Sequence, residues 1–162
     1  MSDGPSMSCT AVARVVVDEA SGVYRLEVLP AYRTALRGLD SCTHAIVVWW
    51  ADRAESEPDL VVDLPYAPGV RTGVFANRSE HRPTPIGITT APLVAVDERA
   101  GTVDLAWIDA LDGTPVVDIK PYLPMADRVM SADYPDWLDG FPASMEAAAA
   151  FFADPSNLER FS

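Results

Sequence analysis

Short runs of β-branched and other apolar residues, separated by glycine and proline, occupy most of the chain. Residues 23–29 alternate most clearly, because Arg25 and Glu27 fall between apolar positions. A period of two residues is typical of a strand with one buried face. The same composition predicts strands at residues 11–17, 45–51, 60–64, 72–76, 86–96, 102–108 and 116–119.

The run at residues 45–51 differs from the others because it is apolar throughout. We expect a strand that is buried on both faces. Residues 97–101 read DERAG, which predicts a hairpin-like turn between the strands on either side.

Two helices are expected. Residues 31–37 predict a short helix that ends at Gly38. Residues 144–153 contain alanine, methionine and glutamate, which are good helix formers. Ser144 can cap the beginning of this helix, and Asp154 followed by proline ends it.

These elements predict a mainly β fold. Many short strands joined by turns with glycine and proline favour a single antiparallel β-barrel-like domain with short helices and a C-terminal helix. A length of 162 residues suits one domain. We expect residues 1–10 to form a flexible N-terminal tail and residues 11–162 to form the domain.

Composition narrows the classes of partner and compartment. Twelve Lys and Arg stand against 24 Asp and Glu, so the formal charge of −12 opposes binding of polyanions. The longest apolar run is far shorter than the roughly 20 residues that cross a bilayer, so no membrane segment is expected. Residues 1–10 do not resemble a signal peptide. Cys9 and Cys42 are too few for a disulfide scaffold, which favours the cytoplasm, and the spacing of cysteine and histidine predicts no metal site.

Residues 77–87 read NRSEHRPTPIG and form the most distinctive segment. Prolines preset its backbone, and its two arginines suit recognition of a carboxylate, a phosphate or the edge of a nucleobase. The alternative is a surface loop whose arginines pair with nearby acids. The fingerprints of dinucleotide, ATP and serine-hydrolase sites, GxGxxG, GxxxxGK[ST] and GxSxG, are absent from the sequence.

Three segments resemble the TrmO/TsaA-like family, in the family's order. Residues 73–87 read GVFANRSEHRPTPIG and are similar to GVFATRSxxRPNPIGL, and residues 111–122 read LDGTPVVDIKPY and are similar to LDGTPVLDIKPY. Residues 36–50 are similar to LxGLExFSHxWVLFW. The resemblance implies a cytoplasmic β-barrel homodimer that binds S-adenosylmethionine near its dimer interface. It also implies methyl transfer to N6 of threonylcarbamoyladenosine beside the anticodon of tRNA.

The resemblance also implies the site residues. Cofactor-binding positions correspond to Asp52, Arg53, Arg78, Ile88, Leu111, Asp112, Gly113 and Thr114. Substrate-binding positions correspond to Arg82, Lys120 and Tyr122. No catalytic residue is assigned, although Asp52 and Asp112 are conceivable bases.

Two of the cofactor positions have a structural alternative of their own. Arg78 would face the cofactor, or it would form an ion pair with Glu80 or Asp52. Ile88 would offer apolar packing or its backbone to adenine, or it would simply belong to the core.

Residues of the motif at positions 111–122 also have structural alternatives. Residues 111–114 would contact the cofactor through an Asp-Gly turn that exposes backbone groups, or they would form a hairpin turn and nothing more. Lys120 would bind substrate, or it would pair with Asp118 or Asp109. His44 is expected to be a structural histidine at the start of a strand.

Three departures from the family pattern leave the function open. Residues 17–23 form a tight turn where the family carries a loop with a PRQ motif, and Thr84 replaces an asparagine. Asp52 and Arg53 stand where the family has histidine and glutamine. The hypotheses are a methyltransferase on modified tRNA, a methyltransferase on a small anionic or amine metabolite, and a barrel that binds S-adenosylmethionine without catalysis.

Overall fold

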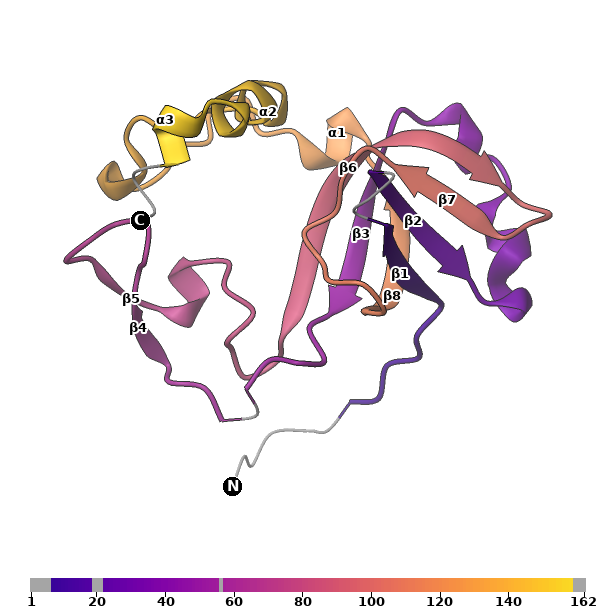
Figure 1. Ribbon diagram of the computed structural model, residues 1–162, viewed down its shortest axis with the longest axis horizontal. Coiled ribbons are helices and arrows are strands. Elements are labelled where there is room, and N and C mark those ends of the chain that lie inside the picture. The colour runs from indigo at the N-terminus through magenta and orange to yellow at the C-terminus, as the bar shows by residue number, and fades with distance from the viewer. Residues whose placement is uncertain (1–6, 19–21, 56, 159–162) are drawn as a thin grey trace. The chain divides into compact units, whose positions relative to one another are not determined.

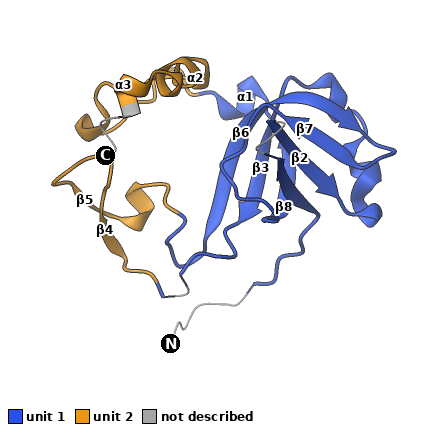
Figure 2. Cartoon of the chain, in the orientation of Figure 1, with its two compact units in different colours: residues 1–57, 80–128 blue, residues 58–79, 129–162 orange. Residues whose placement is uncertain are grey.

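The computed structural model describes residues 7–18, 22–55 and 57–158. The chain divides into two compact units (Figure 2). The first unit comprises Met1–Glu57 and Glu80–Arg128, and the second comprises Pro58–Ser79 and Val129–Ser162. The expectation of one domain over residues 11–162 stays a prediction. Of the expected tail, residues 7–10 are exposed and have no regular structure, and residues 1–6 lie outside the described residues.

A closed antiparallel barrel forms the first unit, which confirms the expected fold class (Figure 1). The strands follow one another around it in the order β1, β2, β7, β6, β3, β8. Their bounds are β1 Ala13–Asp18, β2 Val23–Val28, β3 His44–Trp50, β6 Ile86–Asp97, β7 Thr102–Leu105 and β8 Pro115–Pro121. The predicted strand at residues 102–108 is therefore too long, and the one at residues 116–119 is too short.

The barrel interior is filled by the apolar side chains that alternation predicts. Val15 of β1 lies opposite Leu26 of β2, which in turn lies opposite Val103 of β7, and all three are fully buried. Burying such a side chain contributes about 1.5–3 kcal/mol. The interior layer therefore holds the strands in register, since a shift of one residue would turn these side chains outward.

The prediction that β3 is buried on both faces is wrong. Ala45, Val47 and Trp49 are buried, whereas the residues between them are only half-buried. In a closed barrel one face of each strand lines the interior and the other forms the outer wall. An unbroken apolar run therefore does not require a second covering layer.

The packing of Trp49 explains why the neighbouring strand β6 carries a glycine. Its indole lies against Gly87 of β6, where any Cβ would overlap the ring. The indole Nε1 donates a hydrogen bond of 3.1 Å to Oγ1 of Thr89, and both side chains are buried. The motif glycine is thus a packing requirement of the barrel interior.

One predicted connection changes its helix type, and the predicted tight turn at residues 17–23 lies partly outside the described residues. The helix expected at residues 31–37 is a 3-10 helix, η1 (Pro30–Leu36), and Gly38 follows at φ 85°. Two further short helices, η2 (Leu39–Ser41) and α1 (Pro124–Asp127), were not predicted. The hairpin turn at residues 97–101 is present, because the Asp97 carboxylate accepts hydrogen bonds from the backbone N–H groups of Arg99 and Ala100.

The second unit pairs two short strands and carries the C-terminal helices. Its elements are β4 Val61–Asp63, β5 Arg71–Gly73, η3 Val74–Ala76, η4 Asp136–Leu138, α2 Met145–Ala153 and α3 Pro155–Leu158. The strand expected at residues 72–76 ends early, because η3 begins at Val74. The Ser144 cap is confirmed, since its hydroxyl accepts a hydrogen bond of 3.2 Å from the N–H of Ala147.

Aromatic rings link the separate segments of this unit. Tyr66 lies 6.0 Å from Trp137 and 6.3 Å from Phe141, measured between ring centroids. Phe141 lies 5.8 Å from Phe151 of α2. Partial burial raises the pKa of the Tyr66 hydroxyl. None of the helices in the described part of the chain is long and apolar enough to cross a membrane.

We predict that Gly87→Ala destabilises the barrel, because the new methyl group would overlap the Trp49 indole. Overpacking of this kind typically costs about 1–3 kcal/mol in the free energy of unfolding, which urea titration measures. Gly73→Ala is the matched control, because its Cβ would meet only the Leu60 carbonyl oxygen at 3.8 Å. Equal stability of the two variants would contradict the assignment.

A second prediction concerns acid stability. A hydrogen bond from Arg25, together with its positive charge, lowers the pKa of Asp104; their closest N–O distance is 2.5 Å. Because the folded-state pKa lies below the unfolded one, the pair stabilises the fold above the ordinary aspartate pKa of about 3.9 and loses this effect as the pH falls through the folded value.

Urea titrations of the wild type and Asp104→Asn between neutral and acidic pH test this prediction. The stability difference should shrink as the pH falls, whereas Asp40→Asn, an exposed aspartate with the same charge change, controls for net charge. A difference that stays constant with pH would show that the carboxylate charge does not matter.

Candidate functional site

The segment that enters β8 forms a tight turn at one end of the barrel. The N–H of Thr114 donates to the carbonyl of Leu111 at 3.2 Å, and Gly113 adopts φ 82°, which favours glycine. The turn expected from Asp112 and Gly113 is therefore present. It is not a hairpin turn, because the preceding strand β7 pairs with β2 and β6 rather than with β8.

Strand β1 holds this turn from one side. The Asp112 carboxylate accepts a hydrogen bond of 3.0 Å from the N–H of Val17. The N–H of Gly113 donates to the carbonyl of Val15 at 2.8 Å, and the N–H of Val15 donates to the carbonyl of Thr114 at 2.9 Å. The Asp112 side chain is thus oriented by a strand end and is not simply solvated.

The segment after β3 holds the turn from the other side. Nη2 of Arg53 donates a hydrogen bond of 2.7 Å to the carbonyl oxygen of Asp112. Asp52 lies on the same segment, where its N–H donates to the carbonyl of Trp50 at 2.8 Å. The structure therefore brings together residues that the sequence analysis placed in one site although they are far apart in the chain.

Two apolar side chains of the predicted site are open to solvent. Leu111 is 64% exposed, and Ile88, on β6 opposite Val48, is 49% exposed. The alternative that Ile88 belongs to the core is therefore wrong. Thr114 is the exception among the turn residues, because it is 3% exposed and packs within the barrel unit. Leu111 therefore places exposed apolar surface next to the polar backbone of the turn.

Arg78 belongs to the second unit, whereas the other cofactor-binding candidates belong to the barrel unit. Its neighbour Asn77 is 8% exposed and orders the loop. The Asn77 Nδ2 donates to Oγ1 of Thr72 at 3.2 Å, and its Oδ1 accepts from the N–H of Ser79 at 3.0 Å. The residue before Arg78 thus anchors the loop that contains this arginine.

The predicted substrate-binding residues occupy separate parts of the barrel unit. Arg82 lies in the proline-rich loop before β6, where its N–H donates to the carbonyl of Glu80 at 2.9 Å. Tyr122 follows β8, and its ring centroid lies 6.2 Å from that of His44. These two residues are not in the turn that holds Asp112.

Lys120 forms the ion pair that the structural alternative predicted. Its Nζ lies 2.6 Å from Oδ2 of Asp118, and this hydrogen bond together with the carboxylate charge raises the pKa of Lys120. Both side chains are substantially exposed, so the pair contributes little to stability. Its presence supports a structural role for Lys120 but does not test a role in substrate binding.

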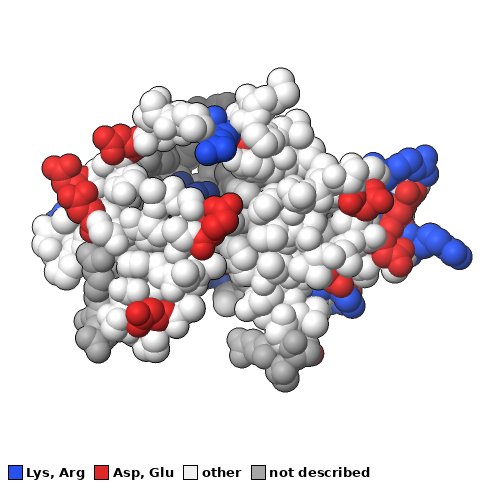
Figure 3. Space-filling view, turned by 90° about the horizontal axis from the view of Figure 1, so that it is seen from above, with Lys and Arg blue, Asp and Glu red and all other residues white. Residues whose placement is uncertain are grey.

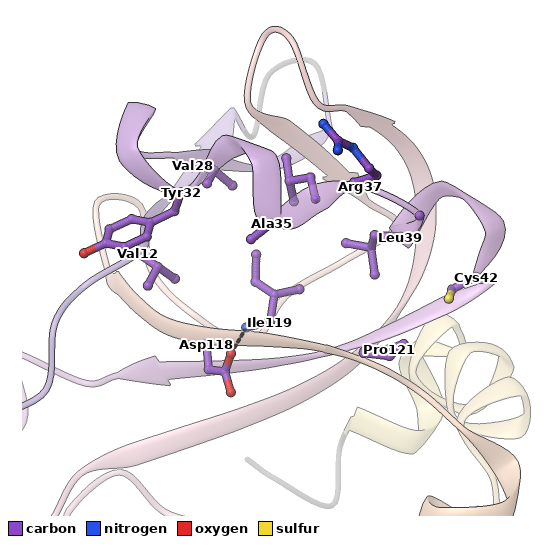
Figure 4. A pocket seen from close by; sticks show the side chains of 12 residues that line it. Val12, Val28, Tyr32, Ala35, Arg37, Leu39, Cys42, Asp118, Ile119 and Pro121 are labelled. Carbon is purple, nitrogen blue, oxygen red and sulfur yellow. Dashed lines mark hydrogen bonds between the residues drawn. The ribbon is translucent and has the colours of Figure 1, made fainter.

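A separate pocket of about 340 Å³ lies between the 3-10 helices and β8 (Figure 4). Ala35, Leu39 and Ile119 face the hollow, whereas the Asp118 carboxylate turns away and accepts a hydrogen bond of 2.9 Å from the N–H of Ile119 (Figure 4). None of the predicted site residues lines this pocket. The sequence analysis did not predict this pocket, although Leu36, Leu39 and Ile119 lie inside two of the motif segments, because the motifs do not show that these segments enclose a hollow.

Several charges on the surface of the barrel unit form ion pairs. Arg14 pairs with Glu27, and Arg37 pairs with Glu98. Figure 3 shows positive and negative side chains next to each other at the right-hand end, and the described residues form no broad patch of Lys and Arg on this face. Within residues 7–18, 22–55 and 57–158, no three His, Cys, Asp or Glu side chains cluster as metal ligands would.

Comparison with known proteins places this geometry in a family. The family model of the tRNA-methyltransferase O N-terminal domain matches residues 14–128. A "Probable S-adenosyl-L-methionine-binding protein" of Archaeoglobus fulgidus is 45% identical over 107 residues, covering 66% of this chain and 28% of the relative. A "Putative S-adenosylmethionine-dependent methyltransferase RcsF" of Pseudomonas aeruginosa is 44% identical over 111 residues, covering 66% and 47%.

A mouse "tRNA (adenine(37)-N6)-methyltransferase" is 40% identical over 90 residues, covering 55% of this chain and 20% of the relative. The chain thus spans less than half the length of these three relatives.

Solved structures agree with the sequence comparisons. A crystal structure of TrmO superposes with a TM-score of 0.66 at 28% identity, covering 98% of this chain and 77% of the other. The crystal structure of TrmO from Pseudomonas aeruginosa gives a TM-score of 0.62 at 26% identity, covering 97% and 79%. The shared motifs, the barrel and these matches lead to one conclusion: the chain belongs to the family of the tRNA-methyltransferase O N-terminal domain.

Proposed function

We propose that this protein is an S-adenosylmethionine-dependent methyltransferase that binds its cofactor at the Asp112–Gly113 end of the barrel and methylates tRNA. One observation carries the proposal: Asp112 is held between β1 and the segment after β3, next to the exposed side chain of Leu111. Such a rigid turn presents backbone donors and acceptors to a ligand at little ordering cost. The names of the relatives support the choice of cofactor.

The chemistry of the available groups fits S-adenosylmethionine. Ile88 and Leu111 offer exposed apolar surface to the adenine ring. The carboxylates of Asp52 and Asp112 suit ribose hydroxyls and the ammonium group. The role of Arg78 rests on its motif position alone, and its guanidinium has the chemistry to bind a carboxylate. The barrel unit also offers the polar backbone of residues 113 and 114 at the same turn.

The reaction asks more for positioning than for side-chain catalysis. The cofactor supplies a methyl group on a sulfonium, which is already activated for transfer. The residues of the chain would orient the acceptor and exclude water, and these effects can supply much of the acceleration. We therefore assign binding and orienting roles and no general base.

The name of the mouse relative supports tRNA as the acceptor, with N6 of threonylcarbamoyladenosine as the specific position. Arg82, Lys120 and Tyr122 would contact it. A small anionic or amine metabolite is the second candidate, favoured by the formal charge of −12, which repels a polyanion. A non-catalytic barrel is the third, favoured by relatives whose names mention only binding. We also propose a cytoplasmic homodimer.

Calorimetric titration with S-adenosylmethionine tests the cofactor. We predict saturable binding by the wild type and about a tenfold weaker Kd for Arg78→Met, which removes a charged hydrogen-bond donor. Arg71→Met is the matched control, because it removes an exposed arginine of β5 from the same unit with the same change of charge. Absence of wild-type binding at millimolar cofactor would contradict the proposal.

Transfer of a labelled methyl group tests the acceptor. With tRNA that lacks the methyl mark, we expect label at N6 of threonylcarbamoyladenosine, at a rate that falls as salt rises from about 50 to 200 mM, because phosphate contacts release counterions. Labelling of small molecules in a metabolite extract, with unlabelled tRNA, would support the second candidate instead. Cofactor binding without any transfer would support the third.

A further inference from the structure

We infer that Arg53 is a positioning residue: it acts on the bound cofactor by fixing the Asp112–Gly113 turn, rather than by contacting the cofactor. The expected effect of Arg53 on cofactor binding rests on the proposed function. The structural part, that Arg53 orders the turn, stands on the contacts of the barrel unit alone.

The backbone of Arg53 is itself held in place. It lies in a turn after β3 in which the N–H of Ala54 donates to the carbonyl of Ala51 at 3.0 Å. The N–H of Ala51 in turn donates to the carbonyl of Pro85 at 2.8 Å, just before β6. The guanidinium therefore extends from a segment that two strands anchor, as a residue that orders a neighbouring turn requires.

Asp112 receives one hydrogen bond from each side of β8, whose neighbours in the barrel are β3 and β1. Its carbonyl oxygen accepts from Nη2 of Arg53 at 2.7 Å, and its carboxylate accepts from the N–H of Val17 at 3.0 Å. A hydrogen bond from a charged donor is stronger than a neutral one. We call these two bonds, from Arg53 and from Val17 to Asp112, the Asp112 clamp.

The clamp matters because β8 is weakly joined to β1. The two strands pair only at Ala13–Val116 and Arg14–Pro115, whereas β8 pairs with β3 from Trp49–Val116 to Ala45–Pro121. The turn that leads into β8 is also exposed from residue 111 to residue 113 and contains a glycine. Without a tie toward β3, only the few bonds to β1 would order it.

Gly113 shows how closely Arg53 covers the turn. A Cβ at Gly113 would lie 3.3 Å from Nη2 of Arg53, which is tighter than an ordinary contact. Glycine at this position therefore serves the positive φ and also leaves room for the guanidinium. The position of the Arg53 guanidinium therefore depends on a glycine at residue 113.

Amide exchange in the absence of ligand tests the positioning role directly. We expect Arg53→Met, which keeps the aliphatic stem but removes the donor, to speed exchange of the Gly113 and Thr114 amides about tenfold. The exchange rates of these amides in Arg53→Lys should lie between those of Arg53→Met and the wild type. The amide of Leu26, inside the barrel, should be unchanged. Arg37→Met, which breaks an exposed ion pair and changes the charge equally, is the matched control.

Calorimetry with S-adenosylmethionine on the same proteins tests the consequence. The Kd of Arg53→Met should weaken by about the factor by which exchange accelerates, and Arg53→Lys should restore part of it. Weaker binding with unchanged exchange would overturn the inference, because Arg53 would then contact the cofactor itself. Unchanged exchange and unchanged binding would overturn it as well. If the wild type binds no cofactor, the proposed function fails, while faster exchange in Arg53→Met would still establish the clamp.

Discussion

Closure of the barrel at β8 is the constraint on which the rest of this structure depends. Strand β3 holds β8 along most of its length, whereas β1 pairs with only its beginning. The final link is made by the turn before β8, which is bonded both to β1 and to the segment after β3. The groups that close the barrel are therefore the groups that shape the proposed cofactor site, so stability and binding share one set of contacts.

Sequence patterns predicted most of the fold for a clear reason. Strand alternation, the Asp-Gly turn and the Ser144 cap are local signals, and all are present in the structure. The error at β3 arose because an apolar run does not tell which side a closed sheet leaves open. The hydrogen bond between Arg53 and Asp112 joins residues 59 positions apart and follows only from the folded topology. The pocket beside η1 is lined partly by residues of two motif segments, 36–50 and 111–122, but only the folded topology brings them together.

The distribution of charged side chains affects which ligands the protein can bind. Arg14, Arg25 and Arg37 of the barrel unit each pair with a carboxylate, so their charge is largely neutralised locally. In the sequence, residues 71–82 form a locally positive segment, with three arginines against Glu80. This distribution of charge suits the proposed binding of a small charged cofactor, and it does not attract polyanions over the whole surface.

The most direct test of this account is a nuclear magnetic resonance titration of the isotope-labelled protein with S-adenosylmethionine. One experiment then compares two regions of the barrel unit, the Asp112–Gly113 turn and the pocket beside η1. The account predicts that the amide signals of Asp52, Ile88 and Gly113 shift with saturation, while those of Ala35, Cys42 and Ile119 in the pocket stay in place. Saturable shifts in the pocket residues with an unchanged Gly113 would contradict the account and would move the cofactor site to the other region.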